Sequence, residues 1–343
     1  MNAPAAGLAR SDFLRAPVLA TARPDGYKEW HHFVVHRPGW RLLVNFNLTS
    51  ENRLNQAPRL VPRVIVIAHQ RRWTGTIGRF DAADLDVAAD LGTLSIGGNR
   101  LSIGPTGYRV LVDLPERDLR GELYLAPASR PFVVNNQPVG EGRLSWLFVP
   151  RLLAYGWFHV DGRDHRLDGE VAYHDHNWGR FRWGDDFGWE WGSVLPASPD
   201  DAWSFVFMRM TDRRRLRALS QALYVWRHDE PAAMFRDAAV RVRWAGLLGR
   251  SPDCTLPTPM ALVLGGEAAD VPASIAITAH RSSDAVRAEF RPESYARLAQ
   301  PSELHLDRSV VLSETSGSAR VSGSIDGEAL DFVGAGVFEL LHG

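Results

Sequence analysis

The sequence predicts an all-β protein, and three observations lead to that prediction. Short runs of β-branched and aromatic residues recur along the whole chain. Turn dipeptides such as Pro-Gly and Asp-Gly separate these runs, in the spacing typical of β-barrels and β-sandwiches. Stretches with the 3.6-residue periodicity of an amphipathic helix are scarce, so the crossover helices of a parallel α/β sheet are missing.

The N-terminal half is predicted to consist of paired strands. Pro38-Gly39 joins the first pair, and Asp161-Gly162 supplies the positive φ angles that a tight hairpin needs. Gly97-Gly98 is interpreted as a hairpin turn rather than a phosphate-binding loop. The expected strands are 31–35, 40–48, 61–69, 72–79, 155–160 and 163–168.

The C-terminal half shows the same pattern, with Asp326-Gly327 as a further hairpin turn and a proline-rich connector at 252–259. The expected strands are 188–195, 202–210, 216–226, 239–244, 273–280, 286–290, 306–315, 318–325 and 329–341. The better candidates for short helices are 81–91 and 292–299.

Length predicts two domains. A chain of 343 residues, 45% of them hydrophobic, exceeds the size at which a single core usually stops growing. Both halves are rich in strands, so we expect two β domains, residues 1–190 and 191–343.

Charge and composition exclude several function classes. The 39 basic and 40 acidic residues are interspersed, which argues against a nucleic-acid partner. Lys28 is the only lysine, and its Tyr-Lys-Glu-Trp context fits neither a P-loop nor a kinase. Cys254 is the only cysteine, so an intrachain disulfide and a cysteine metal cage are excluded. With no secretory apolar run and no 18-residue apolar stretch, we expect a soluble, cytoplasmic protein, compatible with peripheral membrane contact.

The most informative segment is 169–191, where ionisable and aromatic side chains crowd together. The chain also holds 12 tryptophans, which suits a pocket for a hydrophobic ligand. In an extended strand, alternate side chains point to opposite faces. This places Tyr173, Asp175 and Asn177 on one face, and His174, His176 and Trp178 on the other.

Three interpretations of this segment remain open. His174 and His176 form a possible metal pair, but the positions where a cupin-type site has its glutamate hold Arg180 and Phe181. Alternatively, the polar residues cap backbone groups where a strand bends. The third interpretation makes Asp175 a proton donor or substrate anchor, because burial among aromatic rings raises the pKa of a carboxyl group.

The motif Tyr173-His174-Asp175-His176-Asn177-Trp178-Gly179, preceded by 156–162 and 167–169, resembles the signature of the lipocalin-like hydroxyneurosporene synthase (carotenoid 1,2-hydratase) superfamily. That superfamily includes AttH-like proteins and Diels-Alderases, and its signature is similar to that of tocopherol cyclases. The resemblance implies tandem lipocalin-like (calycin) barrels or sandwiches, a hydrophobic small-molecule substrate, and no redox cofactor or metal. It also implies catalytic roles for Tyr173 and Asp175. The family's upstream His-x-Trp pair corresponds here to Trp146-Leu147-Phe148.

The expected chemistry is cofactor-independent hydration, cyclisation or isomerisation of a polyene or terpenoid, in which Asp175 protonates a carbon–carbon double bond. Indole faces stabilise the resulting cation by roughly 0.5–2 kcal/mol each. The expected substrate-binding residues are His174, His176, Asn177, Trp146, Trp157, Trp178, Trp189, Trp191 and Glu190. The two indoles that flank Glu190 are also typical of core packing, and Glu190 itself is also typical of a solvated strand residue. A Diels-Alderase-like pericyclase and a non-catalytic carrier of a lipid or pigment are the alternatives.

Overall fold

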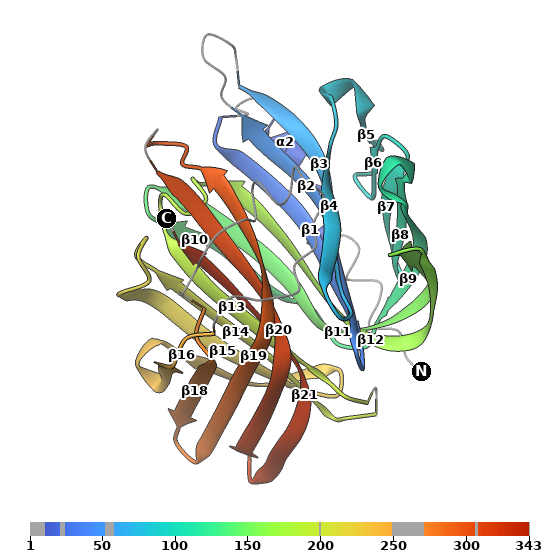
Figure 1. Ribbon diagram of the computed structural model, residues 1–343. Helices are drawn as coiled ribbons and strands as arrows, with labels where there is room; N and C mark the ends of the chain where they lie inside the picture. The colour runs from blue at the N-terminus through green and yellow to red at the C-terminus, as the bar shows by residue number, and fades with distance from the viewer. Residues whose placement is uncertain are drawn as a thin grey trace. The chain divides into compact units, whose positions relative to one another are not determined.

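The computed structural model describes residues 11–20, 25–51, 58–198, 200–248, 271–305 and 308–342. Within these residues most of the chain is antiparallel β-strand, which confirms the predicted lipocalin-like all-β class (Figure 1). Cys254 and the proline-rich connector lie outside the described residues. No helix in the described part of the chain has the length and apolar character needed to span a membrane.

The chain divides into two compact units. The first comprises Met1–Gln70 with Thr74–Phe181, and the second Arg71–Trp73 with Arg182–Gly343. The main division therefore lies after Phe181, and the strand that carries Trp189, Glu190 and Trp191 belongs to the second unit.

The first sheet has the order β4-β3-β2-β1-β12-β11-β9-β8-β7-β6-β5, with β10 paired to β11. Strand β1 is thus the neighbour of β12, although most of the unit's sequence separates them. The strands are β1 (Tyr27–Arg37), β2 (Trp40–Glu51), β3 (Arg59–His69), β4 (Trp73–Arg79), β5 (Leu85–Val87), β6 (Thr93–Ile96), β7 (Asn99–Gly104), β8 (Gly107–Leu114), β9 (Leu119–Pro127), β10 (Phe132–Val139), β11 (Gly142–Val160) and β12 (Arg163–Arg180).

The second sheet has the order β16-β15-β14-β13-β21-β20-β19-β18-β17. Its strands are β13 (Gly188–Pro196), β14 (Trp203–Thr211), β15 (Ala218–Arg227), β16 (Glu230–Arg236), β17 (Val240–Ala245), β18 (Ser274–Arg281), β19 (Asp284–Pro301), β20 (Ser309–Ile325) and β21 (Glu328–His342).

Helical structure in the described residues is limited to short segments: Ser11 and Asp12, α2 (Ala16–Leu19), and the 3-10 turns η2 (Ala82–Asp84), η3 (Pro115–Arg117) and η4 (Asp237–Ala239). Both helix candidates were wrong. In 81–91, the Asp81 cap supports only η2, and the chain then pairs as β5 with β6. The candidate 292–299 is part of β19, where pairing with β20 overrides the local periodicity.

The predicted hairpin turns are confirmed. Asp161 and Gly162 have φ angles of 57° and 69° between β11 and β12, and Asp326 and Gly327 have 50° and 79° between β20 and β21. Positive φ at both turn positions matches the right-handed twist of the flanking strands. Gly97, at φ 57°, lies in the turn between β6 and β7, so this glycine pair is a hairpin turn as expected.

The first sheet presents one face to a large apolar core, here called the core face. Phe33, Val44, Leu147 and Ala172 are among its buried members. Their strand neighbours point to the opposite face, which is also buried around the middle of β1, β11 and β12. Residues 171–178 of β12 are therefore buried on both faces, and the two faces carry different polar groups.

Candidate functional site

The register of β12 confirms the predicted alternation. His174 and His176 lie on the core face, whereas Tyr173, Asp175 and Asn177 lie on the opposite one. Asp175 is opposite His32 of β1 and Phe148 of β11, and His32 is in turn opposite Asn45 of β2. We call this surface the Asp175 face; it comprises Lys28, Trp30, His32, Asn45, Trp146, Phe148, Tyr173, Asp175 and Asn177.

Burial on the Asp175 face is nearly complete. Asp175 is 5% exposed, and Tyr173 and Asn177 are fully buried. The Asn177 side-chain amide donates a hydrogen bond to Asp175 Oδ1. Asn177 Oδ1 and Asn45 Oδ1 have no hydrogen-bond partner among the described residues. A buried amide oxygen without a partner costs free energy, so the Asp175 face retains hydrogen-bond acceptors that a ligand could use.

His32 supplies an uncharged imidazole beside Asp175. Burial, reinforced by the neighbouring His174, lowers the pKa of His32 to about 3. Its Nδ1 lies 3.3 Å from the side-chain nitrogen of Asn45. At neutral pH this ring is therefore uncharged, and it can donate or accept hydrogen bonds without adding positive charge to the site.

Aromatic rings flank the polar row. Trp146 is opposite Asn177, and its ring centroid lies 4.7 Å from that of Phe148. Trp30 is opposite Asn177 from the other side and packs edge-on against Phe181 at 6.0 Å. The Asp175 face thus combines a carboxyl group, amides and two indoles, which are groups suited to protonating a hydrophobic substrate and stabilising a cation.

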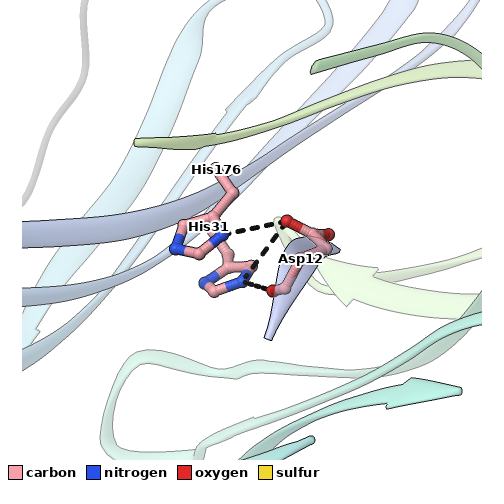
Figure 2. A group of neighbouring side chains, drawn as sticks. All are labelled: Asp12, His31 and His176. Carbon is pink, nitrogen blue, oxygen red and sulfur yellow. Dashed lines mark hydrogen bonds and ion pairs between the residues drawn. The ribbon is translucent and has the colours of Figure 1, made fainter. Parts of the chain in front are cut away.

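The core face carries a second polar group, which we call the histidine cluster: Asp12, Glu29, His31, His174 and His176. Figure 2 shows Asp12 next to His31 of β1 and His176 of β12. Asp12 accepts hydrogen bonds from His174 Nε2 and His176 Nδ1, each at 2.9 Å. His176 Nε2 donates to Glu29 Oε1 at 2.8 Å, and His174 Nδ1 donates to the backbone carbonyl of His32 at 3.0 Å.

Charge within the histidine cluster is compensated. Burial alone would lower the pKa of His176, but its hydrogen bonds to Asp12 and Glu29 raise it to about 9. Burial alone would raise the pKa of Asp12, but the charge of His174 and the hydrogen bonds from both histidines hold it well below its ordinary value. His176 is therefore an imidazolium between two carboxylates at neutral pH.

Glu29 joins the cluster to the segment that precedes the sheet. Its carboxylate accepts hydrogen bonds from the backbone nitrogens of Arg15 and Ala16, at 2.7 and 2.6 Å, and from the Tyr27 hydroxyl at 2.8 Å. Asp12 and Glu29 thereby fix the chain before and within α2 against the core face.

Asp12, His31 and His176 have potential ligand atoms within 4.8 Å of one another. However, the His31 and His176 rings stack, with centroids 3.8 Å apart and planes 19° apart. Metal bonds to imidazole lie in the ring plane, so two stacked rings cannot both direct a lone pair at one ion. Asp12 also already binds two N–H groups. The geometry fits a hydrogen-bonded network better than a metal centre, and the expected absence of a metal stays a prediction.

Several predicted substrate-binding residues lie away from Asp175. His174 and His176 belong to the histidine cluster, and Trp178 packs in the core of the same face. Trp157 is 41% exposed and lines a cavity of about 590 Å³ with Tyr124 and Tyr155. It is opposite Arg166, nine residues before Asp175, or about 30 Å along β12. Trp146 and Asn177, by contrast, do lie on the Asp175 face.

Trp189, Glu190 and Trp191 are buried in the second unit. The Trp189 indole donates to Glu339 at 3.1 Å. Glu190 binds Arg209 at 3.0 Å on the opposite face of β13, and burial raises its pKa although Arg209 opposes the rise. The interpretation of Glu190 as a solvated strand residue was wrong, because its side chain has no exposed surface.

Sequence reasoning missed Asp12, Glu29 and the role of His32. In Trp30-His31-His32 the two adjacent histidines point to opposite faces of β1, His31 to the core face and His32 to the Asp175 face. The motif on β12 does not indicate that β12 pairs with β1. The only local sign of the histidine cluster is that Glu29 lies on the same strand as His31, and nothing in the sequence around Asp12 points to it.

No protein-family model and no curated protein sequence matches the chain. Solved structures do. An AttH-like protein from Nitrosomonas europaea superposes with a TM-score of 0.61 at 14% identity, covering 92% of each chain. Kievitone hydratase from Nectria haematococca gives 0.55 at 12% identity, covering 95% of this chain and 93% of that one. CghA in complex with Sch210972 gives 0.58 at 14% identity, covering 93% and 89%. These likenesses establish a shared fold over nearly the whole chain.

Proposed function

We propose that this protein is an enzyme that protonates a carbon–carbon double bond of a hydrophobic substrate, with Asp175 as the acid and Tyr173 as its partner on the same strand face. The observation that carries the proposal is the buried row His32–Asp175–Phe148, which lies next to the row that holds the indoles of Trp30 and Trp146. The shared fold with a protein named as a hydratase supports it.

Each atom in the proposed hydration is accounted for. The Asp175 carboxyl transfers its proton to one alkene carbon, which leaves a carboxylate and a tertiary cation on the other carbon. Water adds to the cation, and its surplus proton returns to the Asp175 carboxylate. Trp30 and Trp146 present π-electrons to the cation, worth about 0.5–2 kcal/mol each in a dry site.

His32 is suited to hold the water. Its low pKa keeps the ring neutral, so it adds no positive charge beside the cation. The family's upstream His-x-Trp pair is replaced here by Trp146 and Phe148, both on the Asp175 face. In our proposal the imidazole comes instead from β1, on the other side of Asp175.

Isotope incorporation tests the proposal. Purified protein is incubated in D₂O with a panel of prenylated phenols, kievitone included, and linear polyenes, and the products are analysed by mass spectrometry. Hydration puts one deuterium on carbon and adds one water oxygen, whereas cyclisation or isomerisation through a cation adds carbon-bound deuterium and no oxygen. Both outcomes support acid catalysis, provided that Asp175→Asn abolishes them.

The same experiment separates the alternatives. A pericyclase yields an isomer without carbon-bound deuterium, and Asp175→Asn keeps much of the rate. A carrier returns the substrate unchanged. Either result would overturn Asp175 as a proton donor.

A further inference from the structure

The single lysine of this chain is buried on the Asp175 face. The other 38 of the 39 Lys and Arg residues are arginines. Lys28 is only 4% exposed. Lysine is among the residues least often buried, because its ammonium is strongly hydrated. The one position that uses lysine is therefore a position from which water is nearly excluded.

The register places Lys28 in line with the candidate site. It lies on β1 two residues before Trp30 and four before His32, so all three side chains share the Asp175 face. Its partner on β12 is Gly179. Four residues of strand correspond to about 13 Å between the Lys28 row and the Asp175 row.

The row between them is apolar and amide-lined. Trp30, Asn177 and Trp146 lie side by side across β1, β12 and β11. The buried Asn177 Oδ1 in this row has no hydrogen-bond partner among the described residues. A ligand that spans the face would meet a cation at one end, two indoles in the middle and a carboxyl group at the other end.

Contacts on Lys28 show that its ammonium is held in place. Nζ donates to the backbone carbonyl of Phe181 at 2.8 Å and lies 5.7 Å from the centroid of the Phe181 ring. An ammonium carries three donors and a compact charge, which suits a single anionic oxygen, whereas guanidinium matches a planar fork.

We propose that Lys28 binds an anionic oxygen at the polar end of the substrate, about 13 Å from the double bond that Asp175 protonates. The substrate class is then an amphiphilic enolate, phenolate or carboxylate with an unsaturated apolar body. This inference rests on the proposed function for the role of Asp175, but the binding of an anion by Lys28 is tested without turnover.

A single lysine makes the test direct. Protein grown with ¹³Cε-labelled lysine gives one labelled side chain, which is Lys28. Decanoate is the probe, and decanol is its uncharged match. We expect a saturable shift of the Lys28 resonance with decanoate and a smaller shift or none with decanol. Equal responses to both probes, or no response to either, would overturn the proposal and leave Lys28 as a tie for the Phe181 carbonyl.

Variants sharpen the result. Lys28→Met should weaken decanoate binding about tenfold or more while decanol binding changes little, because a hydrogen bond to a charged group is lost. Arg109→Met, at an exposed cation, is the matched control and should bind both probes as the wild type does. Unchanged decanoate affinity in Lys28→Met would contradict the inference.

Asp175→Asn separates this inference from the proposed function. It should keep decanoate binding and the Lys28 shift even though it abolishes deuterium incorporation. If wild-type protein binds decanoate through Lys28 but transfers no deuterium to any substrate, the acid mechanism fails and the anion site stands. If deuterium is transferred and Lys28→Met binds decanoate normally, the acid mechanism stands and the anion site at Lys28 fails.

Discussion

The segment 171–178 of β12 is buried on both faces, but the two faces differ in how their polar groups are satisfied. On the core face, both ring nitrogens of His174 and of His176 have partners, and in the histidine cluster only His31 Nδ1 has none among the described residues. On the Asp175 face, the amide oxygens of Asn45 and Asn177 have none among the described residues. A network whose carboxylates and two of whose three imidazoles are fully hydrogen-bonded stabilises the fold, whereas buried amide oxygens without partners are typical of a site that binds a ligand. We therefore interpret the histidine-rich half of the motif as structural and the Tyr-x-Asp half as the candidate for chemistry.

Removing Asp12 should have the largest effect on stability. Asp12→Ala leaves His174 and His176 buried without their shared acceptor, so we expect the free energy of unfolding to fall by about 3–5 kcal/mol. Urea denaturation measures this change. Asp331→Ala, at an exposed ion pair, should change it by about 0.5 kcal/mol or less. Equal effects in the two variants would show that the histidine cluster does not stabilise the fold.

Alkaline pH should weaken the same cluster. The pKa of His176 rises from 6.5 to about 9 on folding, so its contribution is fully present below pH 6.5 and is lost as pH rises through about 9. The shift corresponds to about 3 kcal/mol. Unfolding free energies measured from pH 6 to pH 10 should show this fall in the wild type and a flatter profile in His176→Gln. Parallel profiles would mean that His176 is not the titrating group.

Asp175→Asn should separate function from stability. The amide keeps an oxygen that can accept the hydrogen bond from Asn177, so the free energy of unfolding should change by no more than about 1 kcal/mol. Carbon-bound deuterium in the product should nevertheless disappear. A large loss of stability in this variant would place Asp175 with the structural groups and remove the contrast between the faces.

Trp157→Ala should have the smallest effect. The side chain is 41% exposed and about 30 Å along the strand from Asp175, so we expect a stability change of about 0.5 kcal/mol or less and unchanged deuterium incorporation. Thermal denaturation and the isotope assay check both expectations. A variant that loses product formation would extend the site to the opposite end of β12.

Much of the local structure was predictable. The Asp-Gly turns at 161–162 and 326–327 and the alternation along 173–178 depend on neighbouring residues, and all are confirmed. The two helix candidates failed for the opposite reason. In 292–299, pairing along β19 and β20 outweighs a weak helical pattern, because sheet hydrogen bonds extend over the whole strand.

The candidate site was predictable only in part. Tyr173, Asp175 and Asn177 were expected to share a face, and Trp146 and Asn177 do lie beside Asp175. Trp157 was grouped with them, but it lies near the turn that joins β11 to β12, about 30 Å along β12 from Asp175. His32 was not among the expected site residues, since nothing in the local sequence shows that it lies opposite Asp175.

The sequence by itself determined that the chain forms strands and which side chains share a face of each strand, because the two-residue period is a property of the extended backbone. The tertiary structure decided which strands lie beside β12. Pairing with β1 brings His32 to Asp175, Lys28 to the same face, and Asp12 and Glu29 to the histidines behind it. That choice depends on register and core packing between segments more than a hundred residues apart, and no local pattern encodes it.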